Sequence, residues 1–136
     1  MDSYGSYPQS SFGQVSIGML APDFYANTTF GPMKLSDYRD KWVILFSHPG
    51  DFTPVCTSEF IAFSNENAKF QELNTQLIGL SIDSNTSHLA WVNSIYKMTG
   101  VQVPFPIIAD RTAEVAKMYG MIAPDASTQV TAVLSA

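Results

Sequence analysis

The sequence predicts an α/β fold in which a central sheet is flanked by helices. The chain has 136 residues, which is the length of one domain and enough to bury a real core. Hydrophobic residues make up 46% and charged residues 14%, so the composition excludes a disordered protein. Short apolar runs alternate along the chain with helix-like patterns, and such alternation is typical of a sheet covered by helices.

The first part of the chain predicts a hairpin and then a buried strand. Phe24–Lys34 contains turn-forming residues in its middle, so we expect a small β-hairpin there. Ser36–Tyr38 predicts a short helical turn. Trp42–Ser47 is a continuous apolar run that stops at His48-Pro49-Gly50, which indicates a strand buried on both faces.

A long helix is predicted over Thr53–Leu73. Thr53 is suited to the N-cap position, and Pro54 stands where the first helical residue belongs. Helical spacing puts four residues on one face of this helix: Phe60, Phe63, Asn67 and Phe70.

The rest of the chain continues the alternation. A second strand is predicted over Gln76–Ile82, a third over Phe105–Ala109 and a fourth over Thr128–Leu134. Two helices lie between them, over Thr86–Thr99 and Arg111–Tyr119. The first of these helices has an apolar stripe and ends at Gly100; the stripe consists of Leu89, Val92, Ile95 and Tyr96. The second helix is capped by Asp110 and ends at Gly120. Since no helix follows the last strand, we expect one face or edge of the sheet to be poorly covered.

Charge and cysteine content narrow the functional classes. The net charge is −5 and the chain has only two arginines, Arg39 and Arg111, which argues against nucleic acid or an anionic membrane as the main partner. A single cysteine excludes an intrachain disulfide, a CxxC redox pair and a multi-cysteine zinc cluster. No secretory signal is evident, so we expect a cytoplasmic protein with a free thiol. Residues 1–14 are expected to form a flexible tail and residues 15–136 the domain.

The segment from His48 to Glu59 carries the functional signal. It joins a buried strand to a helix N-terminus, and ligands of open α/β sheets bind at the carboxyl ends of strands. Cys56 falls in the first helical turn, where unpaired amides and the helix dipole favour a thiolate, the nucleophilic form of cysteine. The alternative is an inert thiol that fills a gap in the core. The position of Cys56 in this loop favours a reactive cysteine.

Four neighbouring residues have both a structural and a functional interpretation. Thr53 is either an N-cap or a hydroxyl that also faces the sulfur three residues later, and one hydroxyl can do both. Pro49 either ends the strand or shields the thiolate from water. His48 either polarises a nearby group or pairs with a carboxylate, or it is a satisfied structural residue. Glu59 either orients a cation near the sulfur or is a solvated helix charge.

These residues resemble the active-site loop of the peroxiredoxins, whose motif is Pro-x-x-x-Thr-x-x-Cys. Pro49, Thr53 and Cys56 meet the motif, and the string HPGDFTPVCTSE is more similar to the one-Cys branch than to the typical two-Cys branch. Further matching segments run in the family order from about Val15 to Val130: Gly18–Phe24, Ile78–Asp83, His88–Trp91, Phe105–Asp110 and Val115–Met121.

The resemblance implies a thioredoxin-like fold and a thiol peroxidase. Cys56 would be the peroxidatic cysteine that becomes a sulfenic acid, Thr53 would hold thiolate and peroxide, and Pro49 would shield the site, with His48 and Glu59 at supporting positions. No metal or organic cofactor is implied. The partners implied are a hydroperoxide, an external thiol reductant, and further copies of the full-length chain in a homodimer or higher oligomer.

Two departures from the family pattern keep other functions open. The family carries an active-site arginine where this chain has Thr131, and family members continue well beyond the length of this chain, so we expect a C-terminally truncated form. The first rival is a catalytically weak thioredoxin-fold remnant that acts by binding. The second is a Cys-His hydrolase using Cys56 and His48, which is disfavoured because the sequence identifies no Asn or Asp that would orient the histidine.

Overall fold

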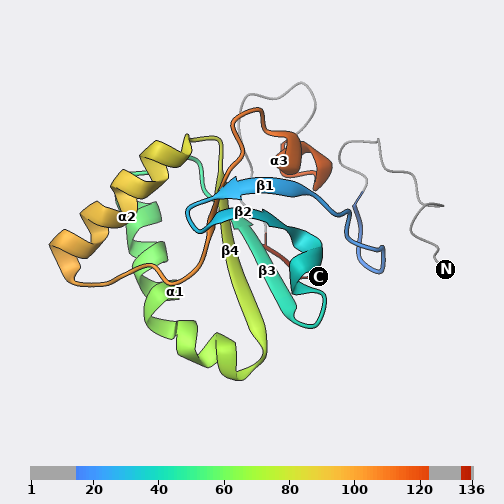
Figure 1. The fold of residues 1–136 in the computed structure, drawn as a ribbon, viewed down its shortest axis with the longest axis horizontal. Helices are drawn as coiled ribbons and strands as arrows, with labels where there is room; N and C mark the ends of the chain where they lie inside the picture. Colours follow the sequence, from blue (N-terminus) through green and yellow to red (C-terminus); the bar gives the residue numbers. More distant parts are fainter. Residues whose placement is uncertain (1–14, 123–132, 136) are drawn as a thin grey trace.

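The computed structural model describes residues 15–122 and 133–135. Ten elements follow one another in an alternating order, as Figure 1 shows. They are β1 (Tyr25–Thr28), β2 (Gly31–Lys34), the 3-10 turn η2 (Leu35–Tyr38), β3 (Trp42–Ser47), α1 (Pro54–Glu72), β4 (Thr75–Ser81), α2 (Asn85–Thr99), β5 (Ile107–Ala109), α3 (Glu114–Met118) and β6 (Val133–Ser135). In this described part, no helix has both the length and the apolar composition needed to cross a membrane.

The strands form one mixed sheet in the order β2-β1-β5-β4-β3-β6. β3, β4 and β5 are parallel neighbours, and the predicted hairpin β1–β2 joins the sheet antiparallel to β5. β6 pairs antiparallel with β3 at the other edge. The predicted strand over 42–47 is confirmed with the same bounds, while residues 128–132 of the last predicted strand lie outside the described residues.

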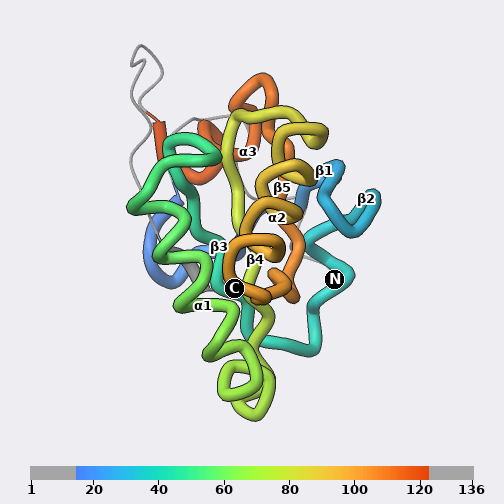
Figure 2. The backbone as a smooth tube through the Cα atoms, turned by 90° about the vertical axis from the view of Figure 1, so that its left-hand side faces the viewer, coloured from blue at the N-terminus to red at the C-terminus, as the bar shows by residue number. Residues whose placement is uncertain are grey.

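Side chains of the central strands alternate between two packed layers. On β3, Val43 and Leu45 face the layer that holds α3 and the hairpin, whereas Phe46 faces the layer under α1 and α2. β5 divides in the same way, with Ile108 in the first layer and Ile107 in the second. Figures 1 and 2 show α1 and α2 side by side on one face and α3 on the other. Helices therefore cover both faces of the parallel strands, as the apolar runs predict.

Helix α1 begins as predicted. Thr53 is its N-cap and Pro54 its first residue, and the Thr53 hydroxyl accepts the amide hydrogen of Cys56. Phe60 and Asn67 are buried on the predicted face. Phe63 and Phe70 are half-buried and pack against the apolar cluster that contains Phe60.

The predicted apolar stripe of α2 is wrong in two of its four members. Leu89 and Tyr96 are about half exposed, while the buried face consists of His88, Trp91 and Ile95. The helix turns this way because His88 donates to the buried Ile108 carbonyl and Trp91 donates to the half-buried Thr57 hydroxyl, so polar contacts as well as hydrophobicity select the buried face. Gly100 ends the helix at φ 74°, as predicted.

The predicted third helix starts too early. α3 begins at Glu114 rather than at Arg111, because Ala113 has φ 60° and the preceding residues form a turn. Ala113, and not the predicted Asp110, occupies the N-cap position, but the Asp110 carboxylate still accepts the amide hydrogens of Val115 and Ala116 at 3.1 and 2.9 Å.

Gly79 of β4 offers a test of the packing under α1. A Cβ at this position would lie 2.9 Å from Cζ of Phe60, a side chain that is 1% exposed. We predict that Gly79→Ala lowers the free energy of unfolding by about 1–3 kcal/mol in urea titrations, because overpacking forces the ring to move. Gly50→Ala is the control, since its Cβ meets nothing within 4 Å and the variant should change stability by less than about 1 kcal/mol. Equal stability of both variants would contradict the packing described here.

Candidate active site

Cys56 is the third residue of α1, directly beyond the loop that follows β3. Its side chain is 3% exposed and belongs to the apolar cluster that also contains Phe60 and Trp91. The amide of Cys56 donates to Thr53 Oγ1 at 3.4 Å. The thiol therefore lies at a helix N-terminus, where backbone amides favour negative charge, and it lies in a mostly apolar pocket.

Thr53 holds the first turn together. Its hydroxyl donates to the Gly50 carbonyl at 3.4 Å while it accepts from the Cys56 amide, so the capping role is confirmed. Among the hydrogen bonds of the described residues, none joins this hydroxyl to the sulfur, and the second predicted role of Thr53 stays a prediction. Phe52 has φ 67°, in the left-handed region that non-glycine residues seldom adopt, so the tight loop carries local strain.

Pro49 and Glu59 lie at the surface around this loop. Pro49 is exposed where the chain leaves β3, and Glu59 is exposed one turn beyond the buried Cys56. No ion pair or hydrogen bond of Glu59 is found among the described residues, and its predicted role near the sulfur stays a prediction. Thr131, the position at which the family arginine is expected, lies outside the described residues.

His48 pairs with a carboxylate, which is one of the roles that the sequence predicts for it. Its ring is 3% exposed, and Nε2 lies 2.7 Å from Oδ1 of Asp51. The ring packs against Phe60 and Trp91 with centroids 4.9 and 5.0 Å away. The sequence alone identified no aspartate that would orient the histidine, which counted against a Cys-His pair. That expectation is wrong, because Asp51 orients His48.

Asp51 is the centre of a buried polar network. Its side chain is 1% exposed, and Oδ2 accepts from Nδ1 of His88 at 2.7 Å and from the Ser87 hydroxyl at 2.9 Å. The Asp51 backbone amide donates to Oδ2 of Asp83 at 2.9 Å. One residue of the loop is therefore fixed to the end of β3, to the chain after β4 and to the first turn of α2.

The ionisation of Asp51 follows from these contacts. Burial alone would raise the pKa of this carboxyl group, but hydrogen bonds from His48, His88 and Ser87 and the charge of His88 outweigh burial. Together they hold the pKa of Asp51 well below its usual range, so the side chain is a carboxylate at neutral pH.

A second bond ties the two helices beside the cysteine. The indole Nε1 of Trp91 on α2 donates to Oγ1 of Thr57, the residue after Cys56, at 3.0 Å. Trp91 is 1% exposed, so α2 fixes the first turn of α1 from the side.

Sequence reasoning missed Asp51, Asp83, Ser87 and His88. Two signals could have found them. Asp51 lies three residues after His48, and His88 is the chain's other histidine, in the first turn of the helix that follows the neighbouring parallel strand. Carboxyl ends of parallel strands meet at one edge of a sheet, so these residues were bound to lie close together.

Four side chains of this network are also of metal-ligating types. Potential ligand atoms of His48, Asp51, Asp83 and His88 lie within 4.8 Å of one another. However, Asp51 Oδ1 lies 2.7 Å from Nε2 of His48, and Asp51 Oδ2 lies 2.7 Å from Nδ1 of His88. These are hydrogen-bond lengths, whereas ligand atoms around tetrahedral zinc lie about 3.3 Å apart. The geometry is that of a hydrogen-bonded network, and the residues as placed do not fit a metal ion.

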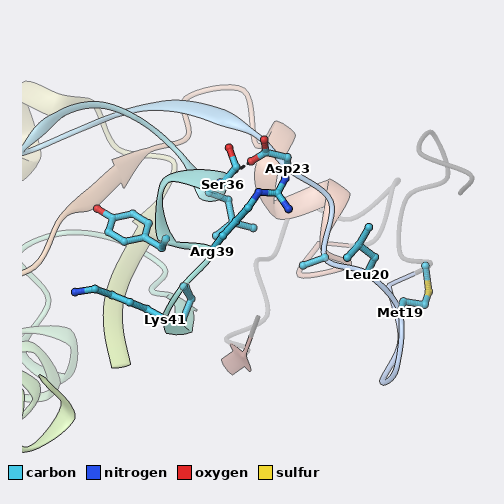
Figure 3. Close-up of a pocket in the computed structure, with 10 residues that line it drawn as sticks. Met19, Leu20, Asp23, Ser36, Arg39 and Lys41 are labelled. Atoms are coloured by element: carbon cyan, nitrogen blue, oxygen red, sulfur yellow. Dashed lines mark hydrogen bonds between the residues drawn. The ribbon is translucent and has the colours of Figure 1, made fainter. Parts of the chain in front are cut away.

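A pocket of about 500 Å³ lies elsewhere in the molecule. Its lining includes Met19, Asp23, Arg39 and Lys41, and it borders the beginning of β3, as the close-up in Figure 3 shows. Cys56 follows the opposite end of that strand, so this pocket is separate from the thiol.

The low pKa of Asp51 predicts how stability depends on pH. A carboxyl group with a lower pKa in the folded state stabilises the fold above its unfolded pKa, about 3.9, and this contribution is lost as pH falls below that value. The free energy of unfolding should therefore fall more steeply between pH 5 and pH 3 in the wild type than in Asp51→Asn, by about 1 kcal/mol. Urea titrations at both pH values measure this difference, and parallel pH dependences would contradict the assignment.

Comparison with known proteins places this site in context. The sequence profile described as the AhpC/TSA family matches residues 17–134. "Peroxiredoxin 2" of Caldanaerobacter subterraneus subsp. tengcongensis is 68% identical over 117 residues, which are 86% of this chain and 52% of that protein. A "Peroxiredoxin" of Aquifex aeolicus is 58% identical over 116 residues, which are 85% of this chain and 52% of that protein. The chain thus spans about half the length of these curated relatives.

Solved structures agree with this result. A yeast mitochondrial 1-Cys peroxiredoxin matches with a TM-score of 0.79 and 38% identity, over 89% of this chain and 62% of that one. A 2-Cys peroxiredoxin of Plasmodium vivax matches with a TM-score of 0.79 and 32% identity, over 89% and 78%. The predicted thioredoxin-like fold and the resemblance to peroxiredoxins are therefore confirmed. Since the family profile covers most of its 136 residues, the chain belongs to the AhpC/TSA family.

Proposed function

We propose that this chain carries the peroxide-reducing centre of a thiol peroxidase, with Cys56 as the nucleophile. The observation that carries the proposal is the setting of the one cysteine: it lies at the N-terminus of α1, 3% exposed, behind a strained loop fixed by Asp51. This setting combines positive backbone dipoles with a pocket that excludes water, and the relatives named above are peroxiredoxins.

The chemistry needs one thiolate and no cofactor. The Cys56 thiolate attacks the terminal oxygen of a hydroperoxide, forming an S–O bond while the O–O bond breaks. Sulfur is oxidised by two electrons to a sulfenic acid, and the peroxide is reduced to an alkoxide or hydroxide that takes up a proton. Thr53 would orient thiolate and peroxide in this step, and Pro49 would shield the sulfenic acid. Glu59, exposed on α1, contributes at most to the charge around the site.

These 136 residues hold no second cysteine, so the sulfenic acid would be reduced by a thiol from outside them, either another molecule or a cysteine in a C-terminal continuation of the chain. The partner proposed is an external thiol, either a small thiol or a thioredoxin-like protein, and the yeast relative is described as being resolved through glutathione/thioredoxin systems. In its full length the protein would act as a homodimer or higher oligomer, in the cytoplasm. Neither nucleic acid nor a membrane is a proposed partner.

Peroxide treatment tests the assignment of Cys56. We predict that stoichiometric hydrogen peroxide adds one oxygen to Cys56, detected by peptide mass analysis after trapping with a sulfenic-acid reagent. Cys56→Ser should consume no peroxide and serves as the control. Oxidation confined to the six methionines would contradict the peroxidase function. An acyl adduct on Cys56 after incubation with an activated ester, without sulfenic acid formation, would support a Cys-His hydrolase instead.

Thr53 tests the distinction between capping and catalysis. We predict that Thr53→Val slows sulfenic acid formation by roughly 10²–10³, because it removes the hydroxyl that we propose acts on the reacting sulfur, while loss of the N-cap costs about 1 kcal/mol of stability. Thr53→Ser keeps the hydroxyl and should retain most of the rate. Stopped-flow measurements with peroxide and urea titrations of both variants give the two numbers. A valine variant that is less stable but equally fast would leave Thr53 with the cap alone.

A further inference from the structure

The C-terminal half of α1 carries a groove on one flank. The groove has a volume of about 330 Å³, and six residues line it: Ala62, Phe63, Glu66, Lys69, Phe70 and Leu73. Thr57, which accepts a hydrogen bond from Trp91 of α2, lies nine residues before Glu66, or about two and a half helical turns. The groove therefore lies on the flank of α1 opposite to α2. Figures 1 and 2 show the last turns of α1 extending beyond α2.

Large apolar side chains are exposed at this end of α1. Leu73, the cap residue of the helix, is 69% exposed, and Trp42 at the start of β3 is 61% exposed. The Trp42 amide donates to the carbonyl of Asn74 at 3.0 Å, so the start of β3 lies beside the end of α1. Phe63 and Phe70 are half-buried, with ring centroids 6.3 Å apart. Exposed apolar side chains gathered in one place mark a contact surface.

Four of the lining residues have the spacing of a helix–helix seam. Residues 62, 66, 69 and 73 follow one another at intervals of four, three and four, which is the spacing of positions a and d in a heptad. These intervals are the same in both chain directions. An antiparallel second copy of the helix therefore places its Leu73 opposite Ala62, a large side chain opposite a small one. The same register places Glu66 opposite Lys69, and a two-fold axis makes each contact twice.

The charges in the groove favour a second copy over other occupants. Glu66 and Lys69 are the two charged residues of the lining, and within one chain they form an ion pair of 2.9 Å with side chains 51% and 76% exposed. An acidic partner would face Glu66 with a like charge, and a basic partner would face Lys69 with one. A fitting partner presents one base opposite Glu66 and one acid opposite Lys69, since like charges brought together oppose binding. The antiparallel copy of α1 meets both requirements.

We propose that two copies of the 136-residue chain associate through this groove, as a two-fold, antiparallel pair of α1 helices. Glu66 of each copy pairs with Lys69 of the other, and the apolar side chains on both sides of these ion pairs are covered. The inference goes beyond the homodimer proposed for the full-length protein, because it names the surface and involves these 136 residues alone. It does not depend on the reaction at Cys56, so either proposal can fail without the other.

Charge reversal tests the proposed register. Sedimentation of the wild type at up to about 100 µM should give the mass of two chains. Glu66→Lys brings lysines opposite lysines, and Lys69→Glu brings glutamates opposite glutamates, so each variant alone should associate at least about tenfold more weakly. An equimolar mixture of the two variants should form a heterodimer, because lysines then face glutamates. A chain with both substitutions should dimerise like the wild type.

Lys97→Glu is the matched control. It makes the same change of charge as Lys69→Glu, on an exposed residue in the last turn of α2, and it should dimerise like the wild type. Circular dichroism and thermal melting check that all variants are folded, as expected for side chains that are at least half exposed.

Three results would overturn the proposal. A monomeric wild type over the whole concentration range would mean that another segment of the chain, or solvent, occupies the groove. A dimer that both single variants retain would place the contact on a different surface. Single variants that dissociate but form no heterodimer when mixed would exclude the antiparallel register of Glu66 and Lys69.

Discussion

The arrangement of the site depends on one buried carboxylate. Asp51 accepts hydrogen bonds from His48 at the end of β3 and from Ser87 and His88 in the first turn of α2. Its backbone amide donates to the Asp83 carboxylate, which follows β4. A buried charge is costly unless it is paired and hydrogen-bonded, so each of these contacts is needed for the others to persist. Because Asp51 stands between the strand and the helix that carries Cys56, its polar contacts help to fix the position of the thiol together with the packing of Cys56 in the apolar cluster.

The sheet explains why these residues meet. β3 and β4 run parallel in register, so His48 and Asp83 leave the sheet at the same edge, and the helices that follow both strands lie on the same face. The polar network therefore forms at the rim of the apolar cluster that encloses Cys56. Trp91 belongs to both environments: its ring packs in the cluster, and its indole nitrogen reaches Thr57 beside the thiol.

Local patterns predicted the elements well and the long-range polar contacts poorly. The strand over 42–47 could be predicted from its own apolar run, and the start of α1 from Thr53 and Pro54, because these signals lie within the elements that they determine. The exposed side of α2 and the late start of α3 depended on buried acceptors at Ile108 and Asp110, which no periodicity reveals. The same reason hid His88: its partner Asp51 is 37 residues away along the chain, and only the parallel crossover brings the two together. Cys56 itself was found because its motif is compact.

The placement of the hairpin has a consequence for how the chain assembles. β1 meets β5 through a bond from the Ile107 amide to the Thr29 hydroxyl, 78 residues apart, and the Tyr119 hydroxyl reaches the Pro22 carbonyl, 97 residues apart. Closing such long loops costs entropy that is regained only when the strands pair. During synthesis, residues 22–34 thus leave the ribosome long before their partners exist, and their apolar side chains Phe24, Ala26 and Met33 wait uncovered until β5 and α3 arrive. This early segment of the domain therefore becomes fully packed only after β5 and α3 have been made.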